Sequence, residues 1–327
     1  MPFKDTDKYL EECIQSILNQ SHENWELIAI NDHSTDNSYP IVESFAERDK
    51  RIRLFNNPGE GIIAALNYAF ELSKGEFITR IDSDDKVPTT RLEEHLNLLE
   101  KAGKGYIATS KIEYFSDKPI GPGYLQYQKW LNSLVDNNSH WENIYRECVI
   151  ASPNWMMHKE DLEQCGAFEG EDYPEDYDLV FRIREQNIKV VSCPKTTLLW
   201  REHSKRISRN DERLTDWYFS KLKVKFFLRN DYQTNKTLVI WGVGNRAKDL
   251  VKLFDDHQIP ILWLSANPNK IGKQIDGHTI VGLNAISNND MLQHIITFTN
   301  QESQKKVVQY MKKEGLNLNE DYSFFAM

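Results

Sequence analysis

Residues 77–85 read Phe77-Ile78-Thr79-Arg80-Ile81-Asp82-Ser83-Asp84-Asp85, an apolar segment that runs directly into three carboxylates. The apolar half predicts a buried strand. Three like charges within four residues repel one another unless a cation lies among them. Oxygen ligands suit a hard divalent ion such as Mg²⁺ or Mn²⁺, which keeps coordination positions open for substrate phosphates. A solvated acidic turn or a helix cap is the alternative that the pattern leaves open.

The segments on both sides of this strand predict alternating strands and helices. We expect strands at 25–30, 52–55, 106–114 and 189–192, and helices at 8–19, 41–48, 61–73 and 90–100, with a further helix that runs through Arg184. Such alternation predicts a mostly parallel sheet with helices on both faces, which binds ligands beyond the carboxyl ends of its strands. Two acidic loops, 32–36 and 82–85, each follow a predicted strand, so we expect both at that edge. Residues 121–143 are aromatic and show no clear periodicity.

A second α/β unit is predicted from about Lys236 onward. A strand at 237–241 leads through the glycine turn 242–247, of the form GxGxxA, into a helix. This pattern is typical of dinucleotide-binding units, but the next strand, 260–264, lacks the acidic residue that contacts the ribose. Nucleotide binding and a structural or dimerising role both stay open. We divide the chain into domain 1–212, a helical linker 213–235 and domain 236–327.

The predicted linker helix, residues 214–228, mixes aromatic with basic side chains. Packing between domains would explain this composition, and so would contact with a membrane surface.

Composition narrows the class of protein. A net charge of -9 over 327 residues argues against a nucleic-acid binder, because the phosphate backbone attracts basic surfaces. The four cysteines form no CxxC pair, which favours free thiols in a reducing compartment. We find no apolar run of about 18 residues and no apolar signal region. We therefore expect a cytoplasmic protein, and contact with the inner face of the membrane stays open.

The acidic motifs, taken in order, resemble those of the family 2 glycosyltransferases, which use nucleotide sugars. The resemblance runs from about Pro2 to Arg209 and rests on the helix 9–20, the loop 31–38, residues 61–67, Asp82-Ser83-Asp84-Asp85 and Glu175-Asp176-Tyr177. It implies an α/β protein with the GT-A nucleotide-diphospho-sugar transferase fold, a mostly parallel mixed sheet between helices. A smaller Rossmann-like α/β domain would follow.

The resemblance also implies roles in donor binding. Asp32 matches the carboxylate that hydrogen-bonds the nucleobase, an interaction that suits uracil or guanine. Asp82 and Asp84 match the DxD motif, in which Asp84 binds Mn²⁺ or Mg²⁺ and Asp82 lies near the ribose or the metal. His203 lies where some relatives supply a histidine to the metal or diphosphate, although a lone exposed histidine usually has no such role. Further implied donor contacts are Asn67, Arg80 and Ser83.

Asp176 matches the general base of the family, and Glu175 would support its position. An inverting transfer needs a carboxylate opposite the departing diphosphate to take the proton of the acceptor hydroxyl. The pair could also simply cap the helix that follows, since negative charge is favourable at a helix N-terminus.

Three positions depart from the family pattern. The family opens with a buried strand, and here Met1-Pro2-Phe3 stands as though that strand were missing, which would expose sheet edges. Relatives often carry Asp where this chain has Asn31, and Arg where it has Leu66. The second change removes a nucleotide contact and leaves the donor less defined.

The sequence therefore predicts an inverting, metal-dependent glycosyltransferase of polysaccharide biosynthesis. It would move a sugar from a nucleotide-diphosphate donor, with a UDP-sugar favoured, to a hydroxyl of a glycan, lipid-linked or other acceptor. A catalytically impaired nucleotide-sugar-binding scaffold is the alternative. A sugar-1-phosphate nucleotidyltransferase would need a glycine-rich basic loop near its N-terminus, and none is present. We expect no nucleic-acid partner, and peripheral membrane contact and a homodimer stay open.

Overall fold

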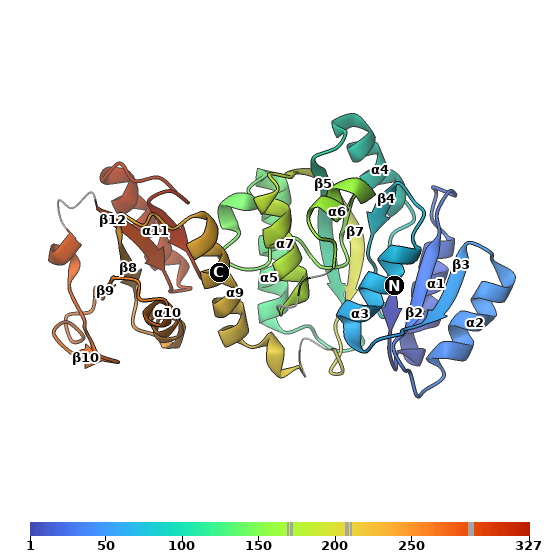
Figure 1. The fold of residues 1–327 in the computed structure, drawn as a ribbon, viewed down its shortest axis with the longest axis horizontal. Helices are drawn as coiled ribbons and strands as arrows, with labels where there is room; N and C mark the ends of the chain where they lie inside the picture. The colour runs from blue at the N-terminus through green and yellow to red at the C-terminus, as the bar shows by residue number, and fades with distance from the viewer. Residues whose placement is uncertain (169, 171–172, 207–208, 210, 287–290) are drawn as a thin grey trace. The chain divides into compact units, whose positions relative to one another are not determined.

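The computed structural model describes residues 1–168, 170, 173–206, 209, 211–286 and 291–327. The chain forms two compact units (Figure 1). The N-terminal unit comprises Met1–His140 and Val149–Asn210, and the C-terminal unit comprises Trp141–Cys148 and Asp211–Met327. Both are α/β units that contain parallel strands, as the alternation of predicted elements indicated.

A small parallel sheet, ordered β1-β2-β3, begins the N-terminal unit. Side chains of β2 alternate between its two faces: Leu27 and Ala29 join the core under α1 and α2, whereas Ile28 and Ile30 pack with residues of α3. Helices therefore cover both faces. The elements are β1 (Pro2–Phe3), α1 (Asp7–Leu18), β2 (Leu27–Asn31), α2 (Ser38–Arg48), β3 (Ile52–Asn56) and α3 (Gly61–Leu72).

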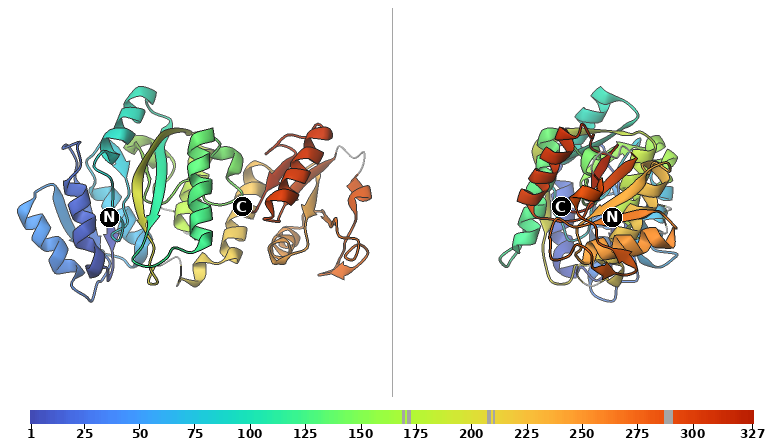
Figure 2. Two further views of the ribbon diagram at one scale, coloured as in Figure 1. Left: turned by 180° about the vertical axis from the view of Figure 1, so that it is seen from behind. Right: turned by 90° about the vertical axis from the view of Figure 1, so that its left-hand side faces the viewer.

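A mixed sheet, ordered β4-β6-β5-β7, completes this unit, with β5 and β7 paired in parallel. The elements are β4 (Phe77–Thr79), α4 (Arg91–Ala102), β5 (Tyr106–Phe115), α5 (Pro122–Asn137), β6 (Trp155–His158), α6 (Lys159–Gln164), α7 (Glu175–Glu185) and β7 (Lys189–Arg201). The sequence analysis did not predict α5, which lies along β5 and β7 (Figure 2). The side chain of Asn132 fastens it by pairing with both backbone polar groups of Ile112.

The first strand, which the sequence analysis expected to be missing, is present in the structure as the two-residue strand β1. Pro2 and Phe3 pair in parallel with Ile30 and Asn31. A cavity of about 660 Å³ lies beside Met1, lined by residues of both β2 and β4. The Met1 amino group donates to the carbonyl of Ile28, and burial lowers its pKa to about 5. Residues from both sheets of the unit, β1-β2-β3 and β4-β6-β5-β7, therefore face this cavity.

The C-terminal unit is built on a parallel sheet ordered β13-β12-β8-β9. The predicted strand, glycine turn and helix are confirmed as β8 and α10. The identity of the unit as a Rossmann-like domain stays a prediction. Its elements are η1 (Trp141–Asn143), η2 (Glu212–Leu214), α9 (Asp216–Asn230), β8 (Thr237–Trp241), α10 (Asn245–Asp256), β9 (Ile261–Leu264), β10 (Gln274–Ile275), β11 (His278–Thr279), η3 (Leu283–Ile286), β12 (Leu292–Ile296), α11 (Gln301–Lys313) and β13 (Tyr322–Phe324).

Two segments belong to the C-terminal unit although the sequence analysis placed them elsewhere. Residues 141–148 were assigned to the first domain, but the ring of Tyr145 stacks on Phe325 with centroids 5.0 Å apart and meets Phe227 edge-on. The predicted linker contains α9, which packs against α10 and buries Phe226 and Phe227 completely. Aromatic burial explains why both segments join this unit.

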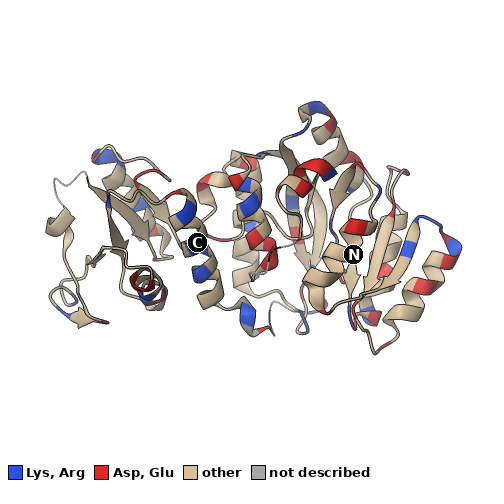
Figure 3. Cartoon of the chain, viewed as in Figure 1, with Lys and Arg blue, Asp and Glu red and all other residues tan. Residues whose placement is uncertain are grey.

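Basic and acidic side chains both occur on the helices of the two units (Figure 3). In the described part of the chain, no helix combines the length and the apolar character needed to cross a bilayer. All four cysteines are buried free thiols.

We predict that Tyr145→Ala destabilises the C-terminal unit by about 3–5 kcal/mol, because it removes a buried ring that packs on two aromatic neighbours. Urea unfolding followed by tryptophan fluorescence would measure the change. Tyr145→Phe is the matched control: it keeps the ring and loses the hydrogen bond to Asp231, which should cost about 1 kcal/mol. Equal stability of Tyr145→Ala and the unaltered chain would contradict the packing.

Candidate active site

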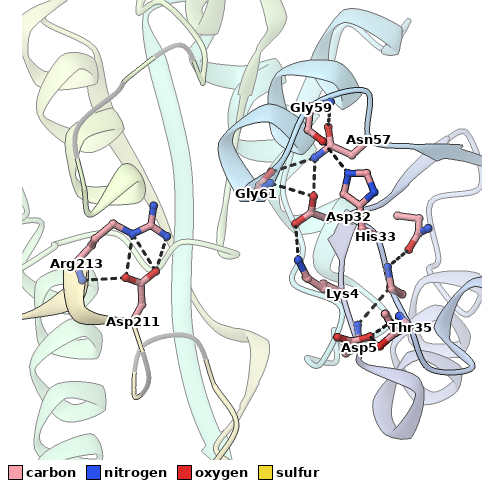
Figure 4. A network of polar contacts seen from close by, with 12 residues as sticks. Lys4, Asp5, Asp32, His33, Thr35, Asn57, Gly59, Gly61, Asp211 and Arg213 are labelled. Carbon is pink, nitrogen blue, oxygen red and sulfur yellow. Dashed lines mark hydrogen bonds and ion pairs between the residues drawn. The ribbon is translucent and has the colours of Figure 1, made fainter.

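Asp32 lies directly after β2, at the carboxyl edge of the small sheet (Figure 4). Its Oδ1 accepts hydrogen bonds from Asn57 Nδ2 at 2.7 Å and from the backbone N–H of Gly61 at 3.0 Å. Its Oδ2 lies 3.8 Å from Lys4 Nζ. Gly61 has a φ of +84°, a conformation that favours glycine and turns its amide toward the carboxylate at the start of α3. Asp32 is therefore fixed at the edge where the sequence predicted ligand binding.

Two residues of the acidic loop after β4 serve to hold the loop. Ser83 is buried, and its Oγ lies 3.1 Å from Thr6 Oγ1. Asp85 is also buried and accepts from the backbone N–H of Arg201 at 2.8 Å. Burial, followed by the charges of Asp84 and Asp82, raises the pKa of Asp85. Asp85 is therefore committed to the loop, and Asp82 and Asp84 are the more exposed carboxylates of the three.

Asp84 and His203 form a pair, with Asp84 Oδ2 at 2.8 Å from His203 Nε2. The end of β7 brings them together, since Lys86 pairs with Leu199 across the two segments and Arg201 Nε donates to the Asp84 carbonyl at 2.6 Å. The side chain of Asp84 is 19% exposed and that of His203 is 14% exposed, so both are largely shielded from solvent but can still be reached by a ligand.

This pair fits a divalent cation that completes its coordination with phosphate and water oxygens. Carboxylate oxygen and imidazole nitrogen are both ligands of Mn²⁺-type ions. Within the described residues, no cluster of three or more potential ligand side chains is present. Asp82, the other predicted metal residue, lies instead against Arg80, with Oδ1 3.0 Å from Nε. An ion at Asp84 and His203 would therefore need ligands from a substrate.

The predicted base, Asp176, lies in the first turn of α7, which begins at Glu175 after Pro174. Its Oδ1 accepts from the backbone N–H of Tyr177 at 2.8 Å. Burial and the adjacent charge of Glu175 raise the pKa of Asp176 to about 7, against the opposing effect of Arg80. A carboxyl group that titrates near neutrality can exchange a proton under physiological conditions.

Arg80 joins the two acidic loops. Its guanidinium is 6% exposed, with Nε at 3.0 Å from Asp82 Oδ1 and Nη1 at 3.3 Å from Glu175 Oε1. Arg80 and Glu175 are 95 residues apart in the sequence. The DxD loop and the loop of the predicted base therefore meet in one region of the N-terminal unit.

Asn67 is less closely tied to this region. It lies partly buried in α3, and in the described ranges no hydrogen bond or ion pair joins it to another predicted site residue. Conversely, sequence analysis missed Asn57, Lys4 and Arg91 as neighbours of site residues. Asn57 follows β3 as Asp32 follows β2, so the rule that ligands gather beyond parallel strands could have identified it.

Comparison with known proteins supports an assignment to a family. Residues 1–166 match the family model described as glycosyl transferase family 2. The chain is 34% identical over 304 residues to the uncharacterized glycosyltransferase EpsJ of Bacillus subtilis, covering 84% of this chain and 80% of that protein. Three further curated glycosyltransferases match over only 40%, 31% and 43% of their own length.

Solved structures show a similar fold at low identity. Residues 1–349 of S. aureus TarS, in complex with UDP, match with a TM-score of 0.53 at 15% identity, over 78% of this chain and 70% of that one. The mannosyltransferase PcManGT from Pyrobaculum calidifontis, in complex with GDP-Man and Mn²⁺, matches with a TM-score of 0.52 at 16% identity, over 77% and 67%. These likenesses indicate a GT-A-like fold. From the family model and the match to EpsJ, the chain belongs to glycosyltransferase family 2.

Proposed function

We propose that the chain transfers a sugar, with inversion, from a nucleotide-diphosphate donor to a hydroxyl of a glycan, lipid-linked or other acceptor. The observation that carries the proposal is the meeting of two carboxylate loops at Arg80, one with the Asp84–His203 pair and the other with Asp176. A donor held at the first loop would lie near a proton acceptor in the second.

The donor side of the reaction uses residues at the strand ends. Asp32 would accept a hydrogen bond from the nucleobase, and Asn67 and Ser83 are proposed as further contacts. A Mn²⁺ or Mg²⁺ ion held by Asp84 and His203, with Asp82 nearby, would neutralise charge on the leaving diphosphate. A UDP-sugar is favoured because a uracil imide N–H suits a carboxylate acceptor, although the guanine edge offers the same donor.

The acceptor side depends on Asp176. As a carboxylate, it would take the proton of the attacking hydroxyl while the new glycosidic bond forms on the sugar face opposite the diphosphate. Its raised pKa makes it a stronger base than an ordinary aspartate once it is ionised. Glu175 and Arg80 surround it with one further negative and one positive charge.

The proposed setting is the assembly of surface polysaccharides or related glycans. The similarity to EpsJ covers 84% of this chain, which is longer than the N-terminal unit alone, so that relative shares part of the C-terminal unit as well. We propose a structural or dimerising role for this Rossmann-like unit.

We expect Asp176→Asn to lower the transfer rate by about 10²–10⁴-fold, because the amide cannot accept the hydroxyl proton. Binding of UDP should stay within about threefold of the unaltered chain, since the residue lies on the acceptor side. Transfer would be measured by the release of UDP from a panel of UDP-sugars, and binding by calorimetry. Unchanged turnover would reject the role of Asp176, and a chain that binds donor but never transfers it would favour the scaffold.

The pH dependence provides a second readout for the same variant. Asp176 is protonated below its raised pKa of about 7 and cannot act as a base there. The transfer rate of the unaltered chain should therefore rise with pH up to about 7 and level off above it. The residual rate of Asp176→Asn should lack this rise, whereas the same rise in the variant would assign it to another group.

Asp84→Ala should weaken Mn²⁺-dependent UDP binding by about tenfold or more, because the pair with His203 loses its carboxylate. Calorimetry with Mn²⁺ and with a chelator would measure it. Asp49→Ala is the matched control, since Asp49 forms a separate ion pair with Arg51 after α2 and should leave binding unaltered. Equal affinity of the unaltered chain for UDP with and without metal would contradict the metal assignment.

A further inference from the structure

Arg80 occupies a position that binding of a donor does not by itself explain. It follows β4, and its guanidinium is almost fully buried between carboxylates from two loops. Nε faces Asp82 at 3.0 Å and Nη1 faces Glu175 at 3.3 Å. Without a cation between them, the two carboxylates would repel each other in a poorly solvated region. The guanidinium therefore stabilises their approach.

The backbone beneath Arg80 is also fixed. Arg91, the buried first residue of α4, donates from Nη2 to the carbonyl of Arg80 at 3.0 Å and to Thr79 Oγ1 at 2.9 Å. Thr79 Oγ1 in turn donates to the carbonyl of Trp155 in the neighbouring strand β6. Contacts with α4 and with the sheet thus hold the backbone of Arg80 in place without a ligand.

We propose that Arg80 is a positioning residue for transfer: by holding Asp82 and Glu175 at once, it sets the place of Asp176 relative to the donor without contacting the donor itself. The inference rests on the proposed function and replaces the donor contact that the sequence analysis assigned to Arg80. Guanidinium suits the task because its rigid, planar fork carries donors that can engage two carboxylates in fixed directions. An ammonium group on a flexible chain cannot fix both directions.

The test separates donor binding from turnover. We expect Arg80→Ala to lower kcat by about 100-fold, as expected when reacting groups shift by about 1 Å, while the Kd for UDP with Mn²⁺ stays within about threefold. Glu175→Gln, which loosens only one side, should lower kcat by about tenfold with the same Kd. Arg80→Lys should restore less than half of the fall in log kcat that Arg80→Ala causes relative to the unaltered chain.

The two residues should act through each other, which a double-variant cycle measures. If Arg80 works through Glu175, the kcat of the double variant Arg80→Ala/Glu175→Gln should lie close to that of Arg80→Ala alone. It should be well above the kcat expected if the fold-losses of the two single variants multiplied. The melting temperature gives a readout independent of transfer, and the fall for the double variant should again be smaller than the sum of the two single falls.

Arg53→Ala is the matched control, because Arg53 also pairs with a glutamate, Glu26, and with a backbone carbonyl, but lies in β3. It should change stability without changing kcat. Multiplicative losses in kcat, or a Kd that weakens as much as kcat falls, would overturn the positioning role. So would normal kcat in Arg80→Ala and Glu175→Gln. Absence of transfer by the unaltered chain would instead count against the proposed function itself.

Discussion

Repulsion among carboxylates is the constraint on which the structure of the N-terminal unit depends. Asp82, Asp84 and Asp85 follow one strand, and Glu175 and Asp176 open a helix that lies beside them. Each carboxylate has a defined counterpart: Arg80 lies between Asp82 and Glu175, His203 faces Asp84, and a backbone N–H faces Asp85. Burial, followed by the charge of Glu175, raises the pKa of Asp176 to about 7. The proposed mechanism uses this raised pKa, because it makes the ionised Asp176 a stronger base toward the acceptor hydroxyl.

Periodicity predicted most of the elements, because their apolar residues alternate with period two or recur with helical spacing. The strand before Asp32 is an example, since Leu27 and Ala29 face one layer of helices and Ile28 and Ile30 the other. Helix α5 escaped prediction because it carries aromatic and polar side chains around most of its circumference. Two side-chain amides, Asn132 and Gln128, bond the backbone of β5, and the buried residues of the helix include Leu131 and Leu134. Propensity alone cannot identify such a helix.

The candidate site was predictable in its residue types and less so in its pairings. Strand ends predicted Asp32, Asp82 and Asp84, although the single parallel sheet expected there is two sheets: β2 lies in the first, and β4 lies in the second and pairs antiparallel with β6. That Arg80 would contact Glu175 as well as its near neighbour Asp82 joins residues 95 positions apart, and no local pattern encodes such a contact. The division into units was similarly non-local: Tyr145 packs on Phe325, close to the other end of the chain. The family resemblance implied a role for each site residue, whereas the structure shows which of their side chains form hydrogen bonds or ion pairs with other residues of the chain.

The central claim is that the donor loop and the base loop serve a single reaction centre. The most direct measurement is a crystal structure of the unaltered chain with UDP and Mn²⁺, with the ion located by its anomalous scattering. The account predicts the ion between Asp84 and His203, with the diphosphate on it and the Asp176 carboxylate open to the same cleft. An ion bound elsewhere, or an Asp176 carboxylate sealed from the nucleotide by protein atoms, would contradict it.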